Sequence, residues 1–479
     1  MEKLKPDRKE FLFLLLCTAL LLWQLFLPGF IGLANNGDYP KVLGPLCIGG
    51  ADNYANNFIF FQSDYVRDPK FCWNPHIPSS ENAIAWLAAS LQNIVQGGSH
   101  FDIRWIAALH SLVFLGFYYS VLLLLRPLHP IPRIVLSLVA LCIFADSGTV
   151  ALFNSFFADT AGVLGGLMTI VLAVHLIQAG TIRRGALVLF GLAALLFVTS
   201  KAPHALAGIV PLAFVVLLGW RVTVPSTRIL AGSIAIVLLA GMTWVLTTTP
   251  GWYQGQARFN LVFFKIAMKD TPAAALDLGE LGLGNADLRY AGTNAYMPHS
   301  PLLDDNWSAN FCDRCTYGRV LSFYLHHPIR MLSFLWSDLN VEARQRRQDN
   351  LSNFRREDGH AAGAKTYRFA LWSSLRSWLF EHWPPHILLW YLFALVALPY
   401  LAIRGKSGYR RAIACVIVAI SFMAVAEFGM ASLADACETH RHLLLFHVFT
   451  DAALFLAFVY GASRISDSQE TCANTGAAI

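Results

Sequence analysis

The chain is short of charge, because only 14% of its 479 residues are Asp, Glu, Lys or Arg, whereas soluble proteins carry about 25%. This deficit excludes an ordinary soluble enzyme. A hydrophobic content of 56% also excludes a disordered chain and a nucleic-acid-binding chain. The sequence has no glycine-rich phosphate loop, nucleotide-binding fingerprint, zinc-protease motif or internal repeat of fixed period. Nothing in the sequence indicates a domain that binds and hydrolyses a nucleotide.

Long apolar runs are what the sequence has instead. A helix needs about 20 apolar residues to cross the hydrocarbon core, and short polar breaks separate ten such runs. The 13 Trp, 15 Tyr and 34 Phe suit a bilayer protein, because aromatic rings collect at membrane interfaces. The predicted fold class is an all-α polytopic membrane protein with about ten transmembrane helices, at residues 11–33, 104–125, 133–152, 160–179, 186–200, 203–220, 229–248, 386–403, 411–430 and 443–462.

Basic residues set the expected orientation, because short cytoplasmic loops are enriched in Lys and Arg. Four cations precede the first run, and alternate breaks are also basic, which places both termini in the cytoplasm. We therefore expect a multi-pass protein of the inner, cytoplasmic membrane whose active face is periplasmic or extracellular. The first run is too long for a signal peptide and lacks a small-residue exit. The cytoplasmic cations are Lys3, Lys5, Arg8, Lys9, Arg126, Arg133, Arg183, Arg184, Arg221, Arg228, Arg404, Lys406, Arg410 and Arg411.

Three parts follow along the chain. Residues 1–248 form a transmembrane module that includes a first outer loop, 34–103, in which residues 83–95 have helical spacing of their apolar residues. Residues 249–385 form a large outer loop, and residues 386–479 form the C-terminal helices with a short cytoplasmic tail.

The second outer loop ends in a basic piece followed by an apolar-aromatic run, 369–380. A solvated surface followed by a helix lying in the membrane interface is the expected structure. The alternative is a basic surface beside a lipid phosphate or an anionic glycan. The basic residues are Arg344, Arg346, Arg347, Arg355 and Arg356.

Five of the nine cysteines belong to the outer loops: Cys47, Cys72, Cys312, Cys315 and Cys437. An oxidising outer face permits disulfides among them, and their pairing is left open. The Cys312-x-x-Cys315 spacing occurs in redox and metal sites. No second pair of suitable spacing accompanies it, so a disulfide or plain thiols are favoured.

Acidic and amide side chains lie at the outer ends of the first, third and fourth runs. Charges beside membrane spans are costly and therefore indicate function. Asn35, Asn36 and Asp38 follow the first run in a segment that also suits an ordinary turn. Asp146, Asn154 and Asp159 lie at the tip between the third and fourth runs, where Asp159 suits a helix N-cap as well as a site.

Two outer cations are left unexplained by the orientation rule. Lys201 is the cation of the break between the fifth and sixth runs, where a snorkelling lysine is a common structural feature. Arg441 and His442 precede the last run, with Asp435 and Glu438 as acids able to hold them in structural ion pairs. An ammonium or guanidinium here also suits a phosphate.

These hairpins bring acids and cations to one face of a helical bundle. A carboxylate can take the proton of an acceptor hydroxyl as general base, while cations stabilise a departing phosphate. This combination is what a membrane-embedded transferase needs when its donor is carried by the bilayer. The sequence predicts that Asp38, Asp159, Lys201 and Arg441 line one cavity.

The segments Asn35-Asn36-Gly37-Asp38-Tyr39 and Asn154-Ser155-Phe156-Phe157-Ala158-Asp159, with the long first loop between spans, resemble the polytopic GT-C glycosyltransferases that use polyprenyl-phosphate-linked sugars. Within that class the chain is most similar to bacterial hexose-transferase-like membrane proteins. The resemblance implies a GT-C-like fold. It makes Asp38 the catalytic base or a metal-associated carboxylate, and Asp159 the second acid.

The resemblance also implies partners: a polyprenyl-phosphate-linked sugar as donor, a glycan, lipid or protein hydroxyl of the cell envelope as acceptor, membrane lipid, and no nucleic acid. The substrate-binding assignments of Lys201, Arg441 and His442 rest on topology, and those of Asn35, Asn36, Asp146 and Asn154 on their place beside the acids. An Asp-x-Asp motif is missing, which leaves a divalent metal cofactor open.

Two other function classes stay as alternatives. A transporter or lipid flippase would use Asp146 and Lys201 in an intramembrane polar path, although the chain lacks repeated halves. A non-catalytic assembly subunit would have scattered polar positions instead of convergent ones.

Overall fold

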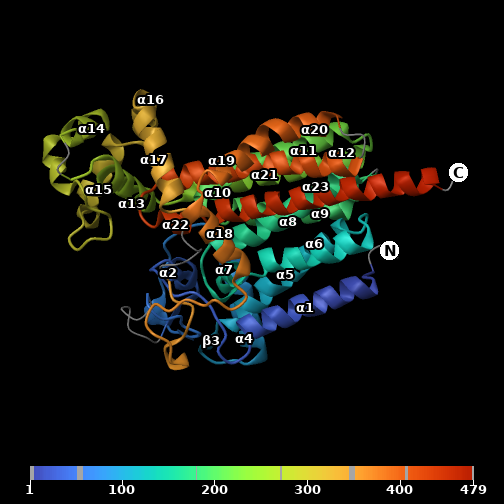
Figure 1. Cartoon of the computed structure of the whole chain (residues 1–479). Coiled ribbons are helices and arrows are strands. Elements are labelled where there is room, and N and C mark those ends of the chain that lie inside the picture. Colours follow the sequence, from blue (N-terminus) through green and yellow to red (C-terminus); the bar gives the residue numbers. More distant parts are fainter. Residues whose placement is uncertain are drawn as a thin grey trace.

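The computed structural model describes residues 5–50, 58–179, 181–269, 272–344, 351–404 and 408–476. The apolar runs form long helices packed side by side, with the loop regions gathered at one end of the bundle and both termini at the other (Figure 1). A three-stranded sheet in the first loop is the small exception to a helical structure. The predicted class of all-α polytopic membrane protein is confirmed.

Six helices of the described residues are long and apolar enough to cross a membrane, and two bent helix pairs raise the number to eight if each pair is one span. The bends are 45° between Pro130–Phe144 and Ser147–Asn154, and 100° between Leu371–His382 and His386–Tyr400. The six spans are α5 (Arg104–Leu124), α8 (Asp159–Gln178), α10 with α11 (Ala202–Ala207 and Ile209–Arg221), α12 (Pro225–Thr248), α21 (Gly408–Leu433) and the Leu444–Ile465 part of α23 (Leu444–Gly476).

The two other expected spans form shorter helices. The run predicted at 186–200 is α9 (Arg184–Val198), which has only 15 residues. The run predicted at 11–33 is α1 (Arg8–Leu25), which ends at Leu25 because Pro28 and Gly29 follow. Gly29 has a φ of 76°, a left-handed conformation that glycine adopts without strain.

The span predicted at 133–152 is not one straight helix. Its first part is α6 (Pro130–Phe144), and Asp146 then caps the short helix α7 (Ser147–Val150) by accepting a hydrogen bond from the Gly148 amide at 2.7 Å. The 45° bend falls between the two helices. The hydropathy of this stretch is uniform, so it gives no sign of the Asp146 cap at which α7 begins after α6 has ended.

Helix α8 lies at the centre of the bundle. It is buried along most of its length and packs against α5, α9, α21 and α23. An apolar helix buried on all sides suits this central place, because it has no polar face to present to water. The first residue of α8 therefore sits inside protein at the loop end of the bundle.

The first loop combines short helices with the small sheet. Residues predicted as helical at 83–95 belong to α4 (Ser80–Val95), which confirms that expectation. Cys47 and Cys72 form a disulfide, whereas Cys312, Cys315 and Cys437 are free. The remaining elements are α2 (Tyr39–Leu43), β1 (Ile48–Gly50), β2 (Asp64–Arg67) and β3 (His100–Asp102), antiparallel in the order β1-β2-β3 with Ile48 opposite Arg67 and Tyr65 opposite Phe101.

The second loop contains a helical unit with its own aromatic core, built around Phe259, Phe263, Phe311 and Phe323. We call this unit, residues 251–344, the outer module. Its helices are α13 (Gly251–Phe259), α14 (Ala274–Glu280), α15 (Asp305–Arg314), α16 (Tyr317–His326) and α17 (Pro328–Asn340).

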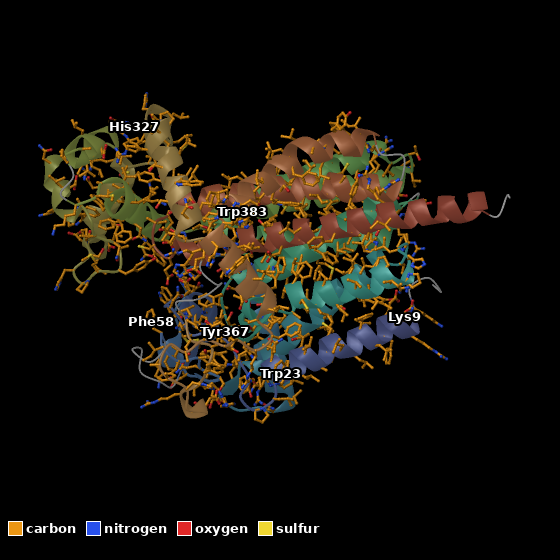
Figure 2. The ribbon with its side chains drawn as sticks, in the orientation of Figure 1. Lys9, Trp23, Phe58, His327, Tyr367 and Trp383 are labelled. Carbon is orange, nitrogen blue, oxygen red and sulfur yellow. A yellow bond between two sulfur atoms is a disulfide. The ribbon has the colours of Figure 1, made fainter. Side chains whose placement is uncertain are left out.

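The run predicted as an interface helix at 369–380 forms α18 (Leu371–His382), which lies across the bundle before the chain turns into α19 (Figure 1). Figure 2 places Trp383 at this turn. Of the basic piece before it, Arg346 and Arg347 lie outside the described residues, and Arg355 pairs with Asp358 at 2.7 Å. The remaining helices are α19 (His386–Leu392), α20 (Leu398–Arg404) and α22 (Thr439–His442).

At the end of the bundle that carries the termini, Glu10 is buried and holds two of the cations used to orient the chain. Arg126 and Arg133 each donate to Glu10 at 2.6 Å, and Arg133 also reaches Asp7 at 2.7 Å. These ion pairs tie α1 to the α5–α6 turn. Arg126 and Arg133 therefore stabilise the packing of α1, in addition to being basic residues from which we predicted the orientation.

The disulfide predicts a stability effect in the first loop. Cys47 and Cys72 are 25 residues apart, and closing a loop of that length removes unfolded-state entropy worth about 3 kcal/mol. Replacing both with Ser is expected to lower the thermal unfolding midpoint in detergent. Cys312→Ser, at a free cysteine, is the matched control. An unchanged midpoint for the double variant would contradict a structural role.

Candidate functional site

The segment after α1 is a turn held by its own asparagines. The Asn35 side-chain oxygen accepts from the amides of Gly37 at 2.8 Å and Tyr39 at 3.1 Å, and the Asn36 oxygen accepts from the Asp38 amide at 3.2 Å. Gly37 has a φ of 103°, which glycine allows. Asp38 lies just before α2 but does not cap it, so its carboxylate is available to the loop end of the bundle.

Two cations hold the Asp38 carboxylate, one on each oxygen. Lys41, one turn along α2, donates to Oδ1 at 2.5 Å, and Arg441 of α22 donates to Oδ2 at 2.8 Å. Burial alone would raise the pKa of Asp38, but the charges of Lys41, Arg441 and Lys201 outweigh burial and hold that pKa well below its usual range. Asp38 is therefore an anion at neutral pH.

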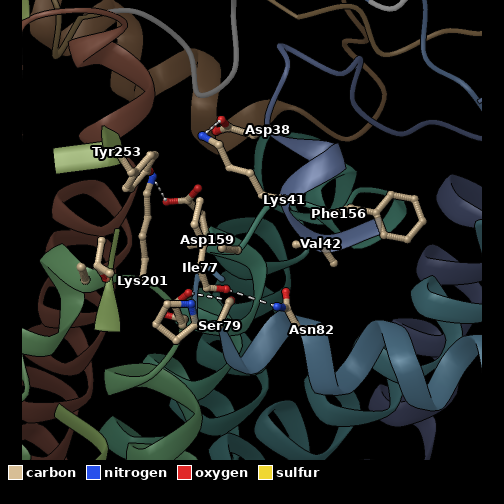
Figure 3. A pocket seen from close by; sticks show the side chains of 15 residues that line it. Asp38, Lys41, Val42, Ile77, Ser79, Asn82, Phe156, Asp159, Lys201 and Tyr253 are labelled. Carbon is tan, nitrogen blue, oxygen red and sulfur yellow. Dashed lines mark hydrogen bonds and ion pairs between the residues drawn. The ribbon is translucent and has the colours of Figure 1, made fainter. Parts of the chain in front are cut away.

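Asp159 is the first residue of α8, and its side chain does not cap the helix, so the N-cap alternative is wrong. Lys201, immediately before α10, lies 3.5 Å from Asp159 Oδ1, and the Nη1 atom of Arg441 lies 4.0 Å from Oδ2. Figure 3 shows the Lys201 and Asp159 side chains pointing toward each other. The four residues predicted to share one cavity, Asp38, Asp159, Lys201 and Arg441, thus lie close together through these ion pairs. Arg441, however, is not among the residues that line the pocket beside them.

Arg441 is the residue that joins the two carboxylates, since the same nitrogen contacts Asp38 and Asp159. Its Nε atom pairs with Glu438 at 3.1 Å, and its guanidinium lies 5.4 Å from the centre of the Phe157 ring. Burial alone would lower the pKa of Arg441, but the charges of Asp38, Glu438 and Asp159 outweigh burial and raise that pKa above its usual value. The guanidinium therefore stays charged. We call Asp38, Lys41, Asp159, Lys201 and Arg441 the charge cluster.

A histidine and a glutamate extend the charge cluster into the bundle. His204 of α10 lies 3.5 Å from Asp159 through Nε2 and 3.2 Å from both Glu427 oxygens through Nδ1. Glu427 is buried within α21, which is a candidate span. Sequence reasoning missed both residues, although a carboxylate inside a span is itself a signal of function.

Four residues of the charge cluster, all except Arg441, line a pocket at the loop end of the bundle (Figure 3). Lys41 and Tyr253 were also missed by sequence reasoning, and they lie together in this pocket with the Lys41 ammonium 4.4 Å from the centre of the Tyr253 ring. The lining residues are Asp38, Lys41, Val42, Ile77, Pro78, Ser79, Asn82, Phe156, Ala158, Asp159, Ser200, Lys201, Ala202, Thr249 and Tyr253.

The family of the chain follows from a comparison with family models. The model of the YfdI N-terminal transmembrane domain matches residues 2–476. The chain belongs to the YfdI N-terminal transmembrane domain family. No curated protein matches this YfdI-family chain.

Among solved structures, the YfdI-family chain is similar to the Archaeoglobus fulgidus oligosaccharyltransferase in its apo form. The two are 11% identical, with a TM-score of 0.37, over 93% of this chain and 50% of the archaeal chain. The chain thus spans about half the length of the protein it matches.

Two predicted binding residues of the YfdI-family chain have structural roles instead. Asp146 is buried and accepts from the amides of Gly148 at 2.7 Å and Ser373 at 2.9 Å, which joins α7 to α18. Asn154 is buried and donates to the carbonyls of Leu25 at 3.0 Å and Ile31 at 2.8 Å. Both side chains satisfy backbone groups that burial would otherwise leave unpaired, so neither lines the pocket.

The other predicted binding residues lie beside the charge cluster. Asn35 shapes the turn, while the Asn36 amide donates to Glu438 at 2.8 Å and so ties the turn to α22. His442 lies 3.8 Å from Asp435. Burial and the charges of Lys201 and Arg441 lower the pKa of His442 well below its usual range, so its ring is neutral.

The acids of the pocket are paired with cations. Within the described ranges, no group of three or more His, Cys, Asp or Glu side chains could hold a metal ion. The two acids of the pocket, Asp38 and Asp159, are instead compensated by Lys41, Lys201 and Arg441.

The lowered pKa of His442 predicts a pH effect on stability. The unfolded chain takes up a proton at this histidine below about pH 6.5, whereas the folded chain does not. Stability from this residue is therefore present above pH 6.5 and lost as the pH falls, by up to about 1.4 kcal/mol per pH unit. Thermal unfolding of wild type and His442→Gln between pH 7 and 5 measures it. The variant is expected to have the flatter profile, and equal profiles would contradict the assignment.

Proposed function

We propose that this chain is a membrane glycosyltransferase that moves a sugar from a polyprenyl-phosphate donor to a hydroxyl acceptor of the cell envelope. The observation that carries the proposal is Arg441, which lies between Asp38 and Asp159. Beside it, Asp38, Lys41 and Lys201 line a pocket that has both a carboxylate for the acceptor and cations for a phosphate.

The position of the pocket, at the ends of the spans, suits a donor that stays in the bilayer. Asp159 begins the α8 span, Lys201 directly precedes the α10–α11 span, and Arg441 lies shortly before the α23 span. A polyprenyl chain beside the spans would place its phosphate at this level, with the sugar in the pocket beyond. By the charge rule, this end of the bundle faces the periplasm or the exterior, and both termini face the cytoplasm.

The proposed reaction is an inverting displacement at the anomeric carbon of the sugar. The acceptor oxygen forms a bond to this carbon while its proton passes to Asp38, and the bond from the carbon to the phosphate oxygen breaks. The polyprenyl phosphate leaves with that electron pair, stabilised by Lys201 and Arg441. Asp38 later gives its proton to water.

The ion pairs of Asp38 bear on this reaction, because a carboxylate whose pKa is strongly lowered is a poor base. A donor phosphate competes with Asp38 for Lys41 and Arg441. Each cation that moves toward the phosphate raises the pKa of Asp38 toward its usual range. Donor binding would in this way supply both the leaving group and a stronger base.

The transporter alternative has no specific support in the described residues. It required Asp146 and Lys201 in one polar path, yet Asp146 pairs with the Gly148 and Ser373 amides and Lys201 with Asp159. The convergence of acids and cations also differs from the scattered polar positions of an assembly subunit.

Asp38→Asn tests the role of the carboxylate. Losing a general base costs about a hundredfold to ten-thousandfold in rate, and the substitution keeps the size of the side chain. We expect that loss in the release of polyprenyl phosphate from a panel of polyprenyl-phosphate sugars by the purified protein. Asp68→Asn, at an exposed acid of the same loop, is the control. Full activity of the Asp38 variant would remove Asp38 from the reaction.

Lys201→Met tests phosphate binding. Loss of a hydrogen bond to a charged group costs about 1.5–3 kcal/mol, so kcat/KM for the donor is expected to fall by roughly ten- to a hundredfold. Lys201→Arg keeps the charge and should recover part of the loss, while the exposed Lys70→Met should match wild type. Equal kcat/KM in Lys201→Met and wild type would show that Lys201 does not bind the donor.

A further inference from the structure

The hairpin of α16 and α17 has one face packed in the outer module and the opposite face exposed. Val320, Phe323 and Tyr324 of α16 belong to the aromatic core of the module. Large exposed apolar side chains recur at helical spacing within each helix, four residues apart on α16 and three and four residues apart on α17. We call these residues the apolar stripe: Leu321, Leu325, Ile329, Leu332 and Trp336.

The apolar stripe runs across the bundle instead of along it. Figure 1 shows α16 and α17 transverse to the long helices, at the ends of those helices. A helix that crosses a bilayer runs along the bundle, whereas a helix that lies on the bilayer surface runs across it. The hairpin has the second arrangement.

Polar contacts hold the hairpin beside the end of the α21 span. Lys265 pairs with Asp338 of α17 at 2.5 Å and donates to the Ser432 carbonyl in the last turn of α21 at 2.7 Å. The Tyr324 hydroxyl donates to the Leu433 carbonyl at 3.3 Å. Because α21 is a candidate span that ends at Leu433, α17 lies at the boundary of the membrane.

The apolar stripe faces the lipid side of this boundary. The rest of the module lies beyond α17 as seen from the spans (Figure 1), and His327, which pairs with Glu280 at 2.9 Å, lies on the side of α14 (Figure 2). The face opposite the module core therefore turns back toward the spans.

The charges near the hairpin do not favour an acidic lipid. Arg330 pairs with Asp277 at 2.6 Å, Arg314 with Asp287 at 3.1 Å and Lys265 with Asp338 at 2.5 Å. Cations that already have carboxylate partners offer little attraction to an anionic head group. Arg319 of α16 is exposed and has no ion pair among the described residues, but one cation adds only about 1 kcal/mol near an anionic surface. Apolar burial is therefore the main interaction that can hold the hairpin on a surface.

We propose that the apolar stripe is an interaction surface for the bilayer in which the chain is embedded. The α16–α17 hairpin inserts the stripe at the boundary between head groups and hydrocarbon, with Trp336 in the aromatic belt. The surface acts by apolar burial and does not depend on anionic lipid.

The position of the hairpin on the bilayer also affects the charge cluster, through contacts between Glu342 and His440. Glu342 follows α17 and accepts from the backbone amide and the ring of His440, each at 3.2 Å. His440 is the neighbour of Arg441 in α22. A hairpin held by the bilayer therefore holds α22 in place, and the inference about the bilayer stands whether or not the chain transfers a sugar.

Nitroxide accessibility tests the proposal with the full chain in nanodiscs of phosphatidylcholine alone. The seven cysteines outside the disulfide, which are Cys472 and the six free cysteines of the described residues, are replaced with Ser. Single labels are then placed by Leu325→Cys or Ile329→Cys. Leu276→Cys is the control, because Leu276 is 73% exposed on α14, at the far side of the module from the spans, and Ile329 is 82% exposed. The three labelled positions, Leu276, Leu325 and Ile329, all carry exposed side chains, and activity of the cysteine-replaced background against wild type in the same nanodiscs checks that its fold is kept.

Labels on the apolar stripe are expected to collide with oxygen, which partitions into lipid, at least several-fold more than with a water-soluble nickel chelate. The control label is expected to show the reverse. Stripe labels that collide with the chelate as the control label does would overturn the proposal. Stripe labels shielded from both reagents, or lying close to labels of a second molecule, would also overturn it, because a protein would then cover the stripe.

Discussion

A single guanidinium lies between a buried carboxylate, Asp159, and a half-buried one, Asp38, at the loop end of the bundle. Arg441 contacts Asp38 at 2.8 Å and Asp159 at 4.0 Å, and charges in such a place are tolerated only when they are paired. Removing the guanidinium would leave Asp38 paired with Lys41 alone and Asp159 with the more distant Lys201 and His204. The first loop, the α8 terminus and the segment before α23 meet at this residue, so their packing depends on it.

The fold supplies the rest of what this ion-pair arrangement needs. Helix α8 is buried along most of its length, which fixes Asp159 in the interior. The asparagine turn presents Asp38 without using its carboxylate as a cap. Behind them, Glu427 holds His204 against Asp159. The arrangement is rich in polar contacts that strengthen one another in a medium of low dielectric constant, and it stays open on the pocket side.

Much of this could be predicted from hydropathy and charge. Spans come from apolar runs, and the charge cluster was found because Asp38, Asp159, Lys201 and Arg441 lie at span ends where charge is costly. Hydropathy could not show that the third run bends at Phe144, since an apolar segment has the same hydropathy whether straight or bent. Asp146 and Asn154 were therefore assigned to binding, although they satisfy backbone groups.

The residues that were missed have two different explanations. Lys41 follows Asp38 by three residues, so only the formation of α2 turns it onto the same carboxylate. Glu427 could have been found, because a carboxylate within the run at 411–430 is itself unusual.

An electron cryo-microscopy map of the chain with a short-chain polyprenyl phosphate tests the central claim most directly. The account predicts phosphate density within hydrogen-bonding distance of Lys201 and Arg441, with Asp38 beside it. Phosphate density elsewhere on the molecule, with these three side chains unliganded at a saturating concentration of the lipid, would contradict it.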